Sequence, residues 1–338
     1  MVAILRSFQP RTIGLAMKTY TNLFSKIIVF NNIHLAYLKA KKNKRYHSDV
    51  LEFFANLTGN LLKIRTELET ETYVHSKYTE FIVNESKKRK IRAPAFRDRV
   101  MHHALCNIII PIFEKSFIDN SYACRKEKGS HKAIKKLRSF LKNRNNLYCL
   151  QCDISKYFDS INHDTLIKII KKKIGCQKTI NLIVKIIDSF NKDTGVGIPI
   201  GNLTSQLFAN IYLNELDQFV SHELKQKYYI RYMDDFLILG SKKDLRDLKI
   251  KVEQFLTDKL QLKMNPKKVN IFPCNKGIDF LGYIVFKDYI LLRKSTIKRF
   301  IKKMKDKGIE EARKAWVAYA KHANSYLLSQ KLFIVVET

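Results

Sequence analysis

The stretch RYMDDFLILG, residues 231–240, places two aspartates side by side within an apolar run. Burying an ionised carboxylate is costly unless a cation compensates its charge, so Asp234 and Asp235 predict a bound metal ion. Neighbouring side chains on a strand point to opposite faces, so both carboxylates reach one ion only if a turn lies between the apolar flanks. Asp-Asp suits a turn, and we therefore expect a β-hairpin with both aspartates at its tip.

A third aspartate, Asp153, ends a separate strand-like segment in CLQCDISKYFDSI, residues 149–161. Two strands that bring carboxylates to one edge of a sheet can hold two Mg²⁺ ions about 4 Å apart, as nucleotidyl transfer requires. One ion lowers the pKa of the attacking hydroxyl, and the other stabilises the leaving pyrophosphate. An isolated Asp-Asp pair is more often an ordinary turn, so the metal hypothesis depends on the three aspartates together and on the charge of the chain.

The chain is strongly basic: 63 Lys and Arg against 31 Asp and Glu give a formal net charge of +32 over 338 residues. So large an excess predicts a polyanionic partner, first nucleic acid and second a membrane surface. Apolar runs such as NIIIPIF, residues 107–113, are far shorter than the ~20 residues of a membrane span. Six scattered cysteines include one Cys-x-x-Cys pair, CLQC at residues 149–152, but no second Cys or His pair at zinc-ligand spacing, which indicates reduced thiols. We expect a soluble cytoplasmic protein without a membrane partner, which starts at Met1 or Met17.

Periodicity predicts an irregular mixture of helices and strands, which is typical of an α+β fold. Apolar residues three and four apart, beginning with Leu51 and Phe54, form one stripe that predicts a helix over residues 48–70, with Ser48 as its N-cap. The segments rich in Tyr, Ile, Phe and Val predict strands. A further helix is expected at residues 131–142, with Ile134, Leu137 and Leu141 inward. Other helices are expected at 163–174, 179–190, 207–220 and the last fifty residues, and strands at 147–155, 228–240 and 278–286.

These segments resemble bacterial reverse transcriptases over nearly the whole chain. YMDD (232–235) is similar to the active-site hairpin of that family, and DISKYFDSI (153–161) to the strand with its first metal-binding aspartate. FRDRVMHHAL (96–105) resembles the fingers of the group II intron-type branch, and IDFLGY (278–283) resembles the primer-grip strands. The resemblance implies a right-hand polymerase fold: fingers, a palm with a small antiparallel sheet, and a helical thumb.

The resemblance also implies the domain boundaries. A helical N-terminal extension is expected at 1–72, fingers at 73–145, a palm at 146–285 with a fingers insertion at about 165–195, and a thumb at 286–338.

The loop IGNLTSQ, residues 200–206, discriminates within the branch. Intron-type enzymes usually start this loop with Gln-Gly and end it with Ser-Pro, whereas Ile200 and Gln206 are similar to the enzymes of diversity-generating retroelements. AYAKHANSYLL (318–328) resembles the thumb of that group. This implies copying of a template RNA into cDNA with frequent errors opposite adenine, hence targeted mutagenesis, and a small basic oligomeric accessory protein.

The resemblance assigns a role to individual positions. Asp153, Asp234 and Asp235 are the implied catalytic residues, and two Mg²⁺ ions would be held by them together with Ile154. Phe158 is either an aromatic gate against the 2′-hydroxyl of a ribonucleotide or a core residue. The primer-grip residues are Phe280, Leu281, Gly282 and Tyr283.

The remaining positions concern the incoming deoxynucleoside triphosphate. Basic residues in the run 84–105 either form a solvated surface or hold the triphosphate, a task suited to Arg. Lys268, or its neighbour Lys267, matches a basic residue that protonates pyrophosphate, and a solvated lysine is equally consistent with the sequence. The nucleotide-binding candidates are Lys88, Lys90, Arg92, Phe158, Gly201, Ser205, Gln206 and Lys268.

Three alternatives remain open. The first is a reverse transcriptase of a retron, of a solitary group II-derived gene or of an antiphage defence system. The second is a non-catalytic RNA-binding scaffold, which the charge permits but for which buried carboxylates have no use. The third is a membrane-surface protein, for which no aromatic and basic amphipathic helix is evident.

Overall fold

The structure is a computed structural model that describes residues 19–84, 88–142, 144–190, 192–307 and 309–337. The choice between Met1 and Met17 as the start falls outside these ranges. Within them, no helix is both long enough and apolar enough to cross a membrane.

The N-terminal part is helical and leads into a two-stranded hairpin. The helix expected at 48–70 is two helices, α3 (Ser48–Ala55) and α4 (Leu57–Glu69), because Asn56 leaves helical geometry and caps α4 with its side chain. His47, not Ser48, is the N-cap of α3. The other elements are α1 (Phe24–Ile28), α2 (Phe30–Ala40), β1 (Thr79–Asn84), β2 (Lys88–Ala93) and α5 (Phe96–Glu114).

An antiparallel sheet of four strands lies at the centre, in the order β4-β5-β3-β6. Helix α11 (Lys242–Leu260) packs along one side of it, and a second sheet with the order β7-β8-β9 follows in sequence. The α+β expectation is confirmed. The strands are β3 (Tyr148–Asp153), β4 (Tyr229–Tyr232), β5 (Asp235–Gly240), β6 (Asn270–Pro273), β7 (Ile278–Phe280), β8 (Tyr283–Val285) and β9 (Ile290–Leu292).

The remaining helices fall into two groups on either side of the sheet. Helix α6 (Ser130–Leu141) packs on β4 and β8, and its inward residues Ile134, Leu137 and Leu141 are buried as expected. The others are α7 (Tyr157–Ser160), α8 (His163–Lys171), α9 (Gln177–Asp188), α10 (Leu203–Gln218), α12 (Lys294–Lys307), α13 (Ile309–Ala320) and α14 (Tyr326–Glu337).

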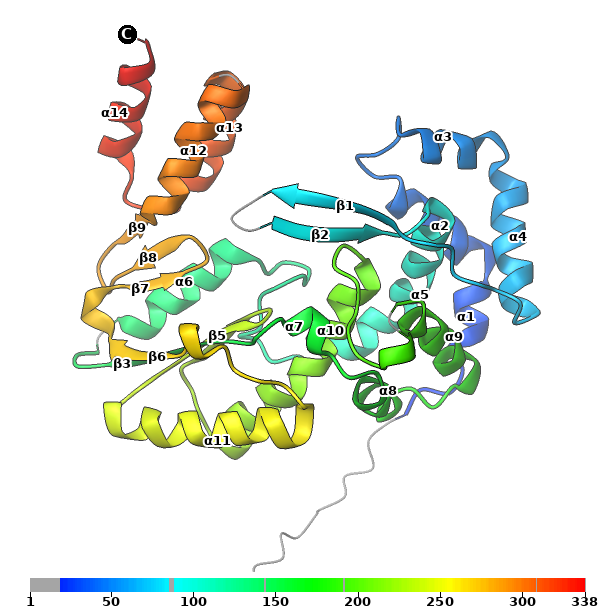
Figure 1. The fold of residues 1–338 in the computed structure, drawn as a ribbon, viewed down its shortest axis with the longest axis horizontal. Helices are drawn as coiled ribbons and strands as arrows, with labels where there is room; N and C mark the ends of the chain where they lie inside the picture. The colour runs from blue at the N-terminus through cyan, green and yellow to red at the C-terminus, as the bar shows by residue number, and fades with distance from the viewer. Residues whose placement is uncertain (1–18, 85–87, 143, 191, 308, 338) are drawn as a thin grey trace, which may run out of the picture.

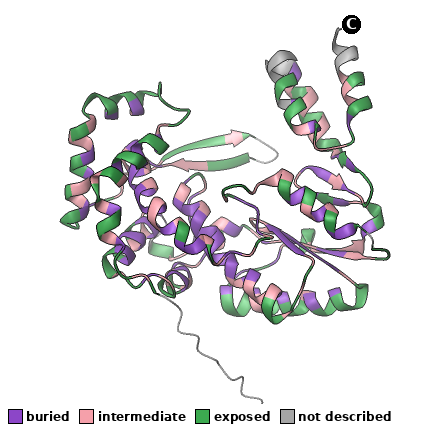
Figure 2. Cartoon of the chain, turned by 180° about the vertical axis from the view of Figure 1, so that it is seen from behind, coloured by how far each residue is buried: buried purple, intermediate pink, exposed green. Residues whose placement is uncertain are grey.

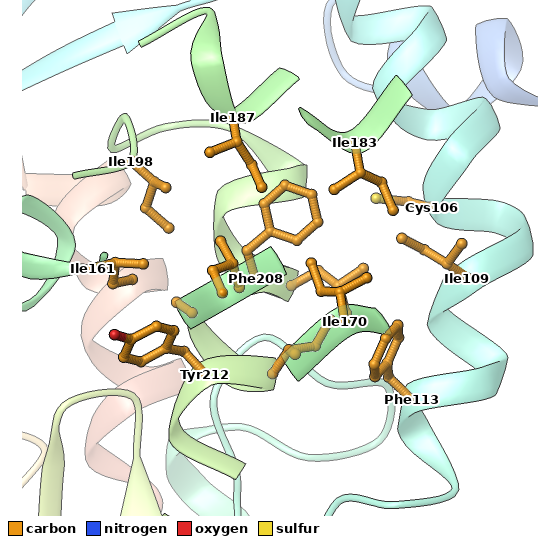
Figure 3. Close-up of a cluster of buried hydrophobic side chains, with 14 of the residues drawn as sticks. Cys106, Ile109, Phe113, Ile161, Ile170, Ile183, Ile187, Ile198, Phe208 and Tyr212 are labelled. Atoms are coloured by element: carbon orange, nitrogen blue, oxygen red, sulfur yellow. The ribbon is translucent and has the colours of Figure 1, made fainter. Parts of the chain in front are cut away.

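The main core joins the central helices to the sheet. Phe208 of α10 lies at the middle of this core, surrounded by apolar side chains from α5, α8 and α9 (Figure 3). Helix α10 is buried along nearly its whole length, which makes it a rigid central element.

The molecule has helical groups at its two ends. Helices α1–α4 lie at one end and α12–α14 at the other, with the hairpin β1–β2 extending from the first toward the second (Figure 1). Viewed from behind, burial is concentrated in the sheet and central helices, whereas α3, α4, α11 and the hairpin are largely exposed (Figure 2). This arrangement puts the end of β3 and the β4–β5 turn in the middle of the molecule.

Candidate active site

Three aspartates meet at one edge of the central sheet. Asp153, the last residue of β3, lies directly opposite Asp235, the first residue of β5. The β4–β5 loop consists of Met233 and Asp234, since Tyr232 pairs with Asp235. The expected hairpin is present, but its tip lies one residue earlier than expected, with Asp234 in the turn and Asp235 already in the strand.

The carboxylates at this edge destabilise one another when ionised. Burial and, after it, the negative charges of Asp153 and Asp234 together raise the pKa of Asp235 to about 7, although Lys268 lowers it. Burial also raises the pKa of Asp234; a backbone hydrogen bond, Lys268 and Arg89 partly offset this. Within the described part of the chain, Asp235 Oδ1 is buried without a hydrogen-bond partner. The edge therefore needs a cation.

Lys268 supplies one such charge. Its Nζ contacts Asp153 Oδ2 in an ion pair, and Asn265 donates a hydrogen bond of 3.2 Å from Nδ2 to Asp153 Oδ1. The backbone N–H of Asn265 also donates to the carbonyl of Asp153, at 2.8 Å. Two neighbouring residues, Asn265 and Lys268, thus fix this carboxylate.

The donor chemistry fits Mg²⁺, which prefers carboxylate and carbonyl oxygens. The unpartnered Asp235 Oδ1 is such a donor, and the apolar, buried side chain of Ile154 leaves only its backbone carbonyl for this purpose. However, among the described residues no three His, Cys, Asp or Glu side chains already form a metal-binding group. The Lys268 ammonium pairs with Asp153 Oδ2, so a metal ion at this edge would share the Asp153 carboxylate with Lys268.

Phe158 lies on the short helix α7, five residues after Asp153, and its side chain is half-buried. Its ring packs edge-on against Tyr157 at 5.6 Å between centroids, and its carbonyl accepts a hydrogen bond of 2.8 Å from the N–H of Ile198. The ring borders the core without being enclosed by it. This position is compatible with the gate, because an enclosed ring would have no surface to offer a sugar.

The basic residues of β2 divide between the two faces of the hairpin. Lys90 and Arg92 share one face with Glu80 and form ion pairs with it. Arg89 belongs to the opposite face, and its positive charge, after a backbone hydrogen bond and Lys268, is one of the influences that oppose the raised pKa of Asp234. Lys88 is exposed on the face of Lys90. The strand alternation from Pro94 backward would have revealed this division in the sequence, and Arg89 was missed.

The loop at 200–206 lies against β2. The N–H of Arg92 donates to the carbonyl of Ile200 at 3.1 Å, and a Cβ at Gly201 would lie 2.9 Å from Ile91. Gly201 has a φ of +118°, which residues with a side chain rarely adopt, and a side chain there would also collide with Ile91. The structure thus brings Arg92 and Gly201 together. Ser205 is buried and Gln206 half-buried in the first turns of α10.

The expected primer-grip residues form the tight β7–β8 turn. Leu281 and Gly282 occupy it with φ of +51° and +89°, while Phe280 and Tyr283 are buried on either side. Tyr319 of α13 donates to the carbonyl of Leu281 at 2.8 Å, and its ring stacks on Tyr283. The C-terminal helices therefore hold this turn directly.

Substituting Gly282 tests that contact. A Cβ would lie 2.2 Å from Tyr319 Oη, which its hydrogen bond and stacking hold in place. We expect Gly282→Ala to lower the free energy of unfolding by about 3 kcal/mol and Gly129→Ala by about 1 kcal/mol in denaturant titrations. Gly129 is a matched control, with φ of +111° and no described atom within 4 Å of its Cβ. Equal losses would contradict a role for Tyr319, whereas Tyr319→Phe should partly rescue Gly282→Ala.

Known proteins share sequence with this chain. The family described as reverse transcriptase (RNA-dependent DNA polymerase) matches residues 77–285. Protein YkfC of Escherichia coli (strain K12) is 28% identical over 239 residues, which cover 58% of this chain and 63% of that protein. Group II intron-encoded protein LtrA of Lactococcus lactis subsp. cremoris is 27% identical over 361 residues, covering 83% and 59% respectively.

Among solved structures, apo telomerase from Candida tropicalis superposes with a TM-score of 0.47 at 15% identity, covering 70% of this chain and 60% of that chain. The chain spans about three fifths of the length of both curated relatives.

Proposed function

We propose that this chain, which belongs to the reverse transcriptase (RNA-dependent DNA polymerase) family, copies an RNA template into DNA by adding deoxynucleotides to a primer hydroxyl. One observation carries the proposal: Asp153 lies opposite Asp235 in the β3–β5 ladder, with Asp234 in the adjacent turn. Three carboxylates at one sheet edge are costly in a folded protein unless the site uses them. A formal charge of +32 suits the nucleic-acid partner.

The three aspartates would hold two Mg²⁺ ions, which supply charge stabilisation and an activated primer hydroxyl. The side chains of the protein orient the carboxylate of Asp153 and balance its negative charge. Asn265 keeps Asp153 in one orientation. Lys268 stands at the same carboxylate, from which its ammonium can donate a proton to the pyrophosphate that departs.

Further residues would bind the nucleotide and the primer. We assign Arg89, whose positive charge acts on Asp234, a role in triphosphate binding beside Lys88, Lys90 and Arg92. Phe158 would exclude the ribose 2′-hydroxyl. The loop with Gly201, Ser205 and Gln206 would lie under the new base pair, and the β7–β8 turn would hold the primer. The proposed domains keep the boundaries 1–72, 73–145, 146–285 and 286–338.

We further propose that this enzyme belongs to a diversity-generating retroelement. Ile200 and Gln206, which flank the loop where the base pair is checked, support this assignment. The proposal includes frequent errors opposite template adenine, a dedicated template RNA and a small basic accessory protein. The reverse transcriptase of a retron or a defence system would use the same chemistry, without errors concentrated opposite template adenine.

Primer extension on a defined RNA template tests both levels. The full chain is incubated with Mg²⁺, four deoxynucleotides and a DNA primer, with EDTA-treated protein as the blank, and the products are sequenced. Extension with errors concentrated opposite adenine supports both proposals, whereas extension with evenly rare errors removes the diversifying role. If no extension occurs even when the template RNA and accessory protein of the same locus are added, the scaffold alternative replaces the enzyme.

A further inference from the structure

Arg231 lies in β4, two residues before the turn, and is fully buried. All five of its N–H donors have acceptors in the structure. Nε and Nη2 form a bidentate pair with Asp217 at 2.7 and 2.5 Å. Nη2 also donates to Ser121 Oγ at 3.1 Å, and Nη1 donates to Asn210 Oδ1 at 3.3 Å and to the backbone carbonyl of Met233 at 3.0 Å.

The last of these bonds reaches the catalytic turn. Met233 has φ of +57°, in the left-handed region that side-chain-bearing residues rarely adopt. Its carbonyl belongs to the peptide group that it shares with Asp234. A donor fixed on that carbonyl fixes the plane of the peptide, and with it the direction in which the Asp234 side chain leaves the backbone. A backbone conformation of this kind costs free energy, and it persists only where surrounding contacts hold it in place.

The other end of the guanidinium is anchored on α10. Asp217, near the end of that helix, is fully buried, and its Oδ1 also accepts a hydrogen bond of 2.7 Å from Tyr229 Oη. Asn210, one of the acceptors of Arg231, is itself fixed by donating to the carbonyl of Ala123 at 2.8 Å. Arg231 therefore connects the buried helix α10 to the Met233–Asp234 loop. Through these hydrogen bonds the position of the helix fixes the position of the loop.

We propose that Arg231, anchored by Asp217, is a positioning residue that holds the Met233–Asp234 peptide so that Asp234 and Asp235 face Asp153. A buried ion pair is a poor way to gain stability, since an apolar pair of similar size often serves as well. A planar fork with five donors is, in contrast, the side chain best suited to fix several acceptors at once. This inference rests on the proposed function, because it assigns Arg231 to the metal-binding edge of the same site.

Arg231→Lys is the first test, with Tyr229→Phe as the matched control. Both variants disturb the Asp217 network, but only the first removes the donor to the Met233 carbonyl. We expect Arg231→Lys to lower kcat on the order of 10- to 100-fold, to raise the Mg²⁺ concentration for half-maximal rate, and to leave KM for the primer–template nearly unchanged. Tyr229→Phe should change kcat less than about 2-fold. A kcat loss of equal size in both variants, measured below their melting temperatures, would overturn the proposal.

A second variant covers the case in which Arg231→Lys does not fold. The double substitution Arg231→Met with Asp217→Leu removes both charges, so neither remains buried without its partner. It should lose kcat to the same extent, and unchanged kcat would exclude the positioning role. The rise in melting temperature on adding Mg²⁺ alone separates this inference from the proposed function. If wild type extends no primer, a Mg²⁺-induced rise in wild type that the double variant lacks still supports the positioning role of Arg231. Equal rises in both proteins reject that role.

Discussion

Asp235→Asn is expected to reduce primer extension by at least roughly 1000-fold while making the metal-free protein more stable at about pH 8. The activity falls because an amide replaces a charged oxygen ligand. The stability rises because burial and two neighbouring carboxylates make an ionised Asp235 unfavourable. Its pKa lies at about 7 in the fold against an ordinary 3.8, so the folded protein holds this proton more tightly than the unfolded chain.

The sign of the pH dependence follows. Between about pH 4 and pH 7 the folded state binds the extra proton, so the stability of metal-free wild type falls as pH rises through this window. The variant lacks this decrease, and a gain on the order of 4 kcal/mol above pH 7 is expected. Added Mg²⁺ should stabilise wild type by binding the folded state, with a weaker apparent affinity below pH 7, where the proton competes.

Thermal melts with EDTA or Mg²⁺ across this pH range, together with extension rates, check the prediction. Asp247→Asn on the exposed side of α11 is the matched control and should change neither quantity. An active Asp235→Asn enzyme would remove Asp235 from the metal site. An inactive variant without the stability gain would mean that the carboxylate is well solvated.

Phe158→Ala is expected to reduce the preference for deoxynucleotides over ribonucleotides on the order of 100-fold, equivalent to about 2.7 kcal/mol. A half-buried ring beside the catalytic strand excludes one oxygen by contact, and a methyl group leaves that space open. The expected change is a gain in ribonucleotide kcat/KM with a smaller loss for deoxynucleotides.

Single-nucleotide addition with each substrate measures this ratio. Phe158→Tyr retains the bulk of the ring and should retain the preference. If Phe158 is only a packing residue, Phe158→Ala lowers both rates together with the melting temperature, and the ratio stays unchanged.

The sequence predicts local structure well where a period is uninterrupted. The helix at 131–142 and the hairpin around residue 234 are confirmed, since each depends on one clear pattern and its flanks. The helix expected at 48–70 is interrupted at Asn56, where a side-chain cap competes with the continuous helix. Leu51 and Phe54, expected to face inward, are exposed, and Val50 and Phe53 are buried in their place.

The site was harder to predict because its contacts join distant segments. Asp153 and Asp235 were identifiable as acids beside apolar strand-like runs, but their direct opposition depends on strand register, which neither segment fixes alone. Arg89 was missed because it stands in a run of basic residues, where only the alternation of the strand separates the two faces. Arg231 was missed for a different reason: its partners lie outside β4, with Asn210 and Asp217 on α10 and Ser121 in the segment before α6, and only tertiary structure brings them together.

The order β4-β5-β3-β6 determines when the three aspartates can come together during synthesis of the chain. Strand β3 pairs with β5 and β6, both of which are made only after the long helical segment that contains α7 to α10. Non-local pairing of this kind slows folding, because a large loop must close before its contacts form. A nascent chain that ends before the β4–β5 turn contains Asp153 without Asp234 and Asp235. The three carboxylates therefore come together only after β4 and β5 have been made, and fragments cut between β3 and β4 are expected to be inert.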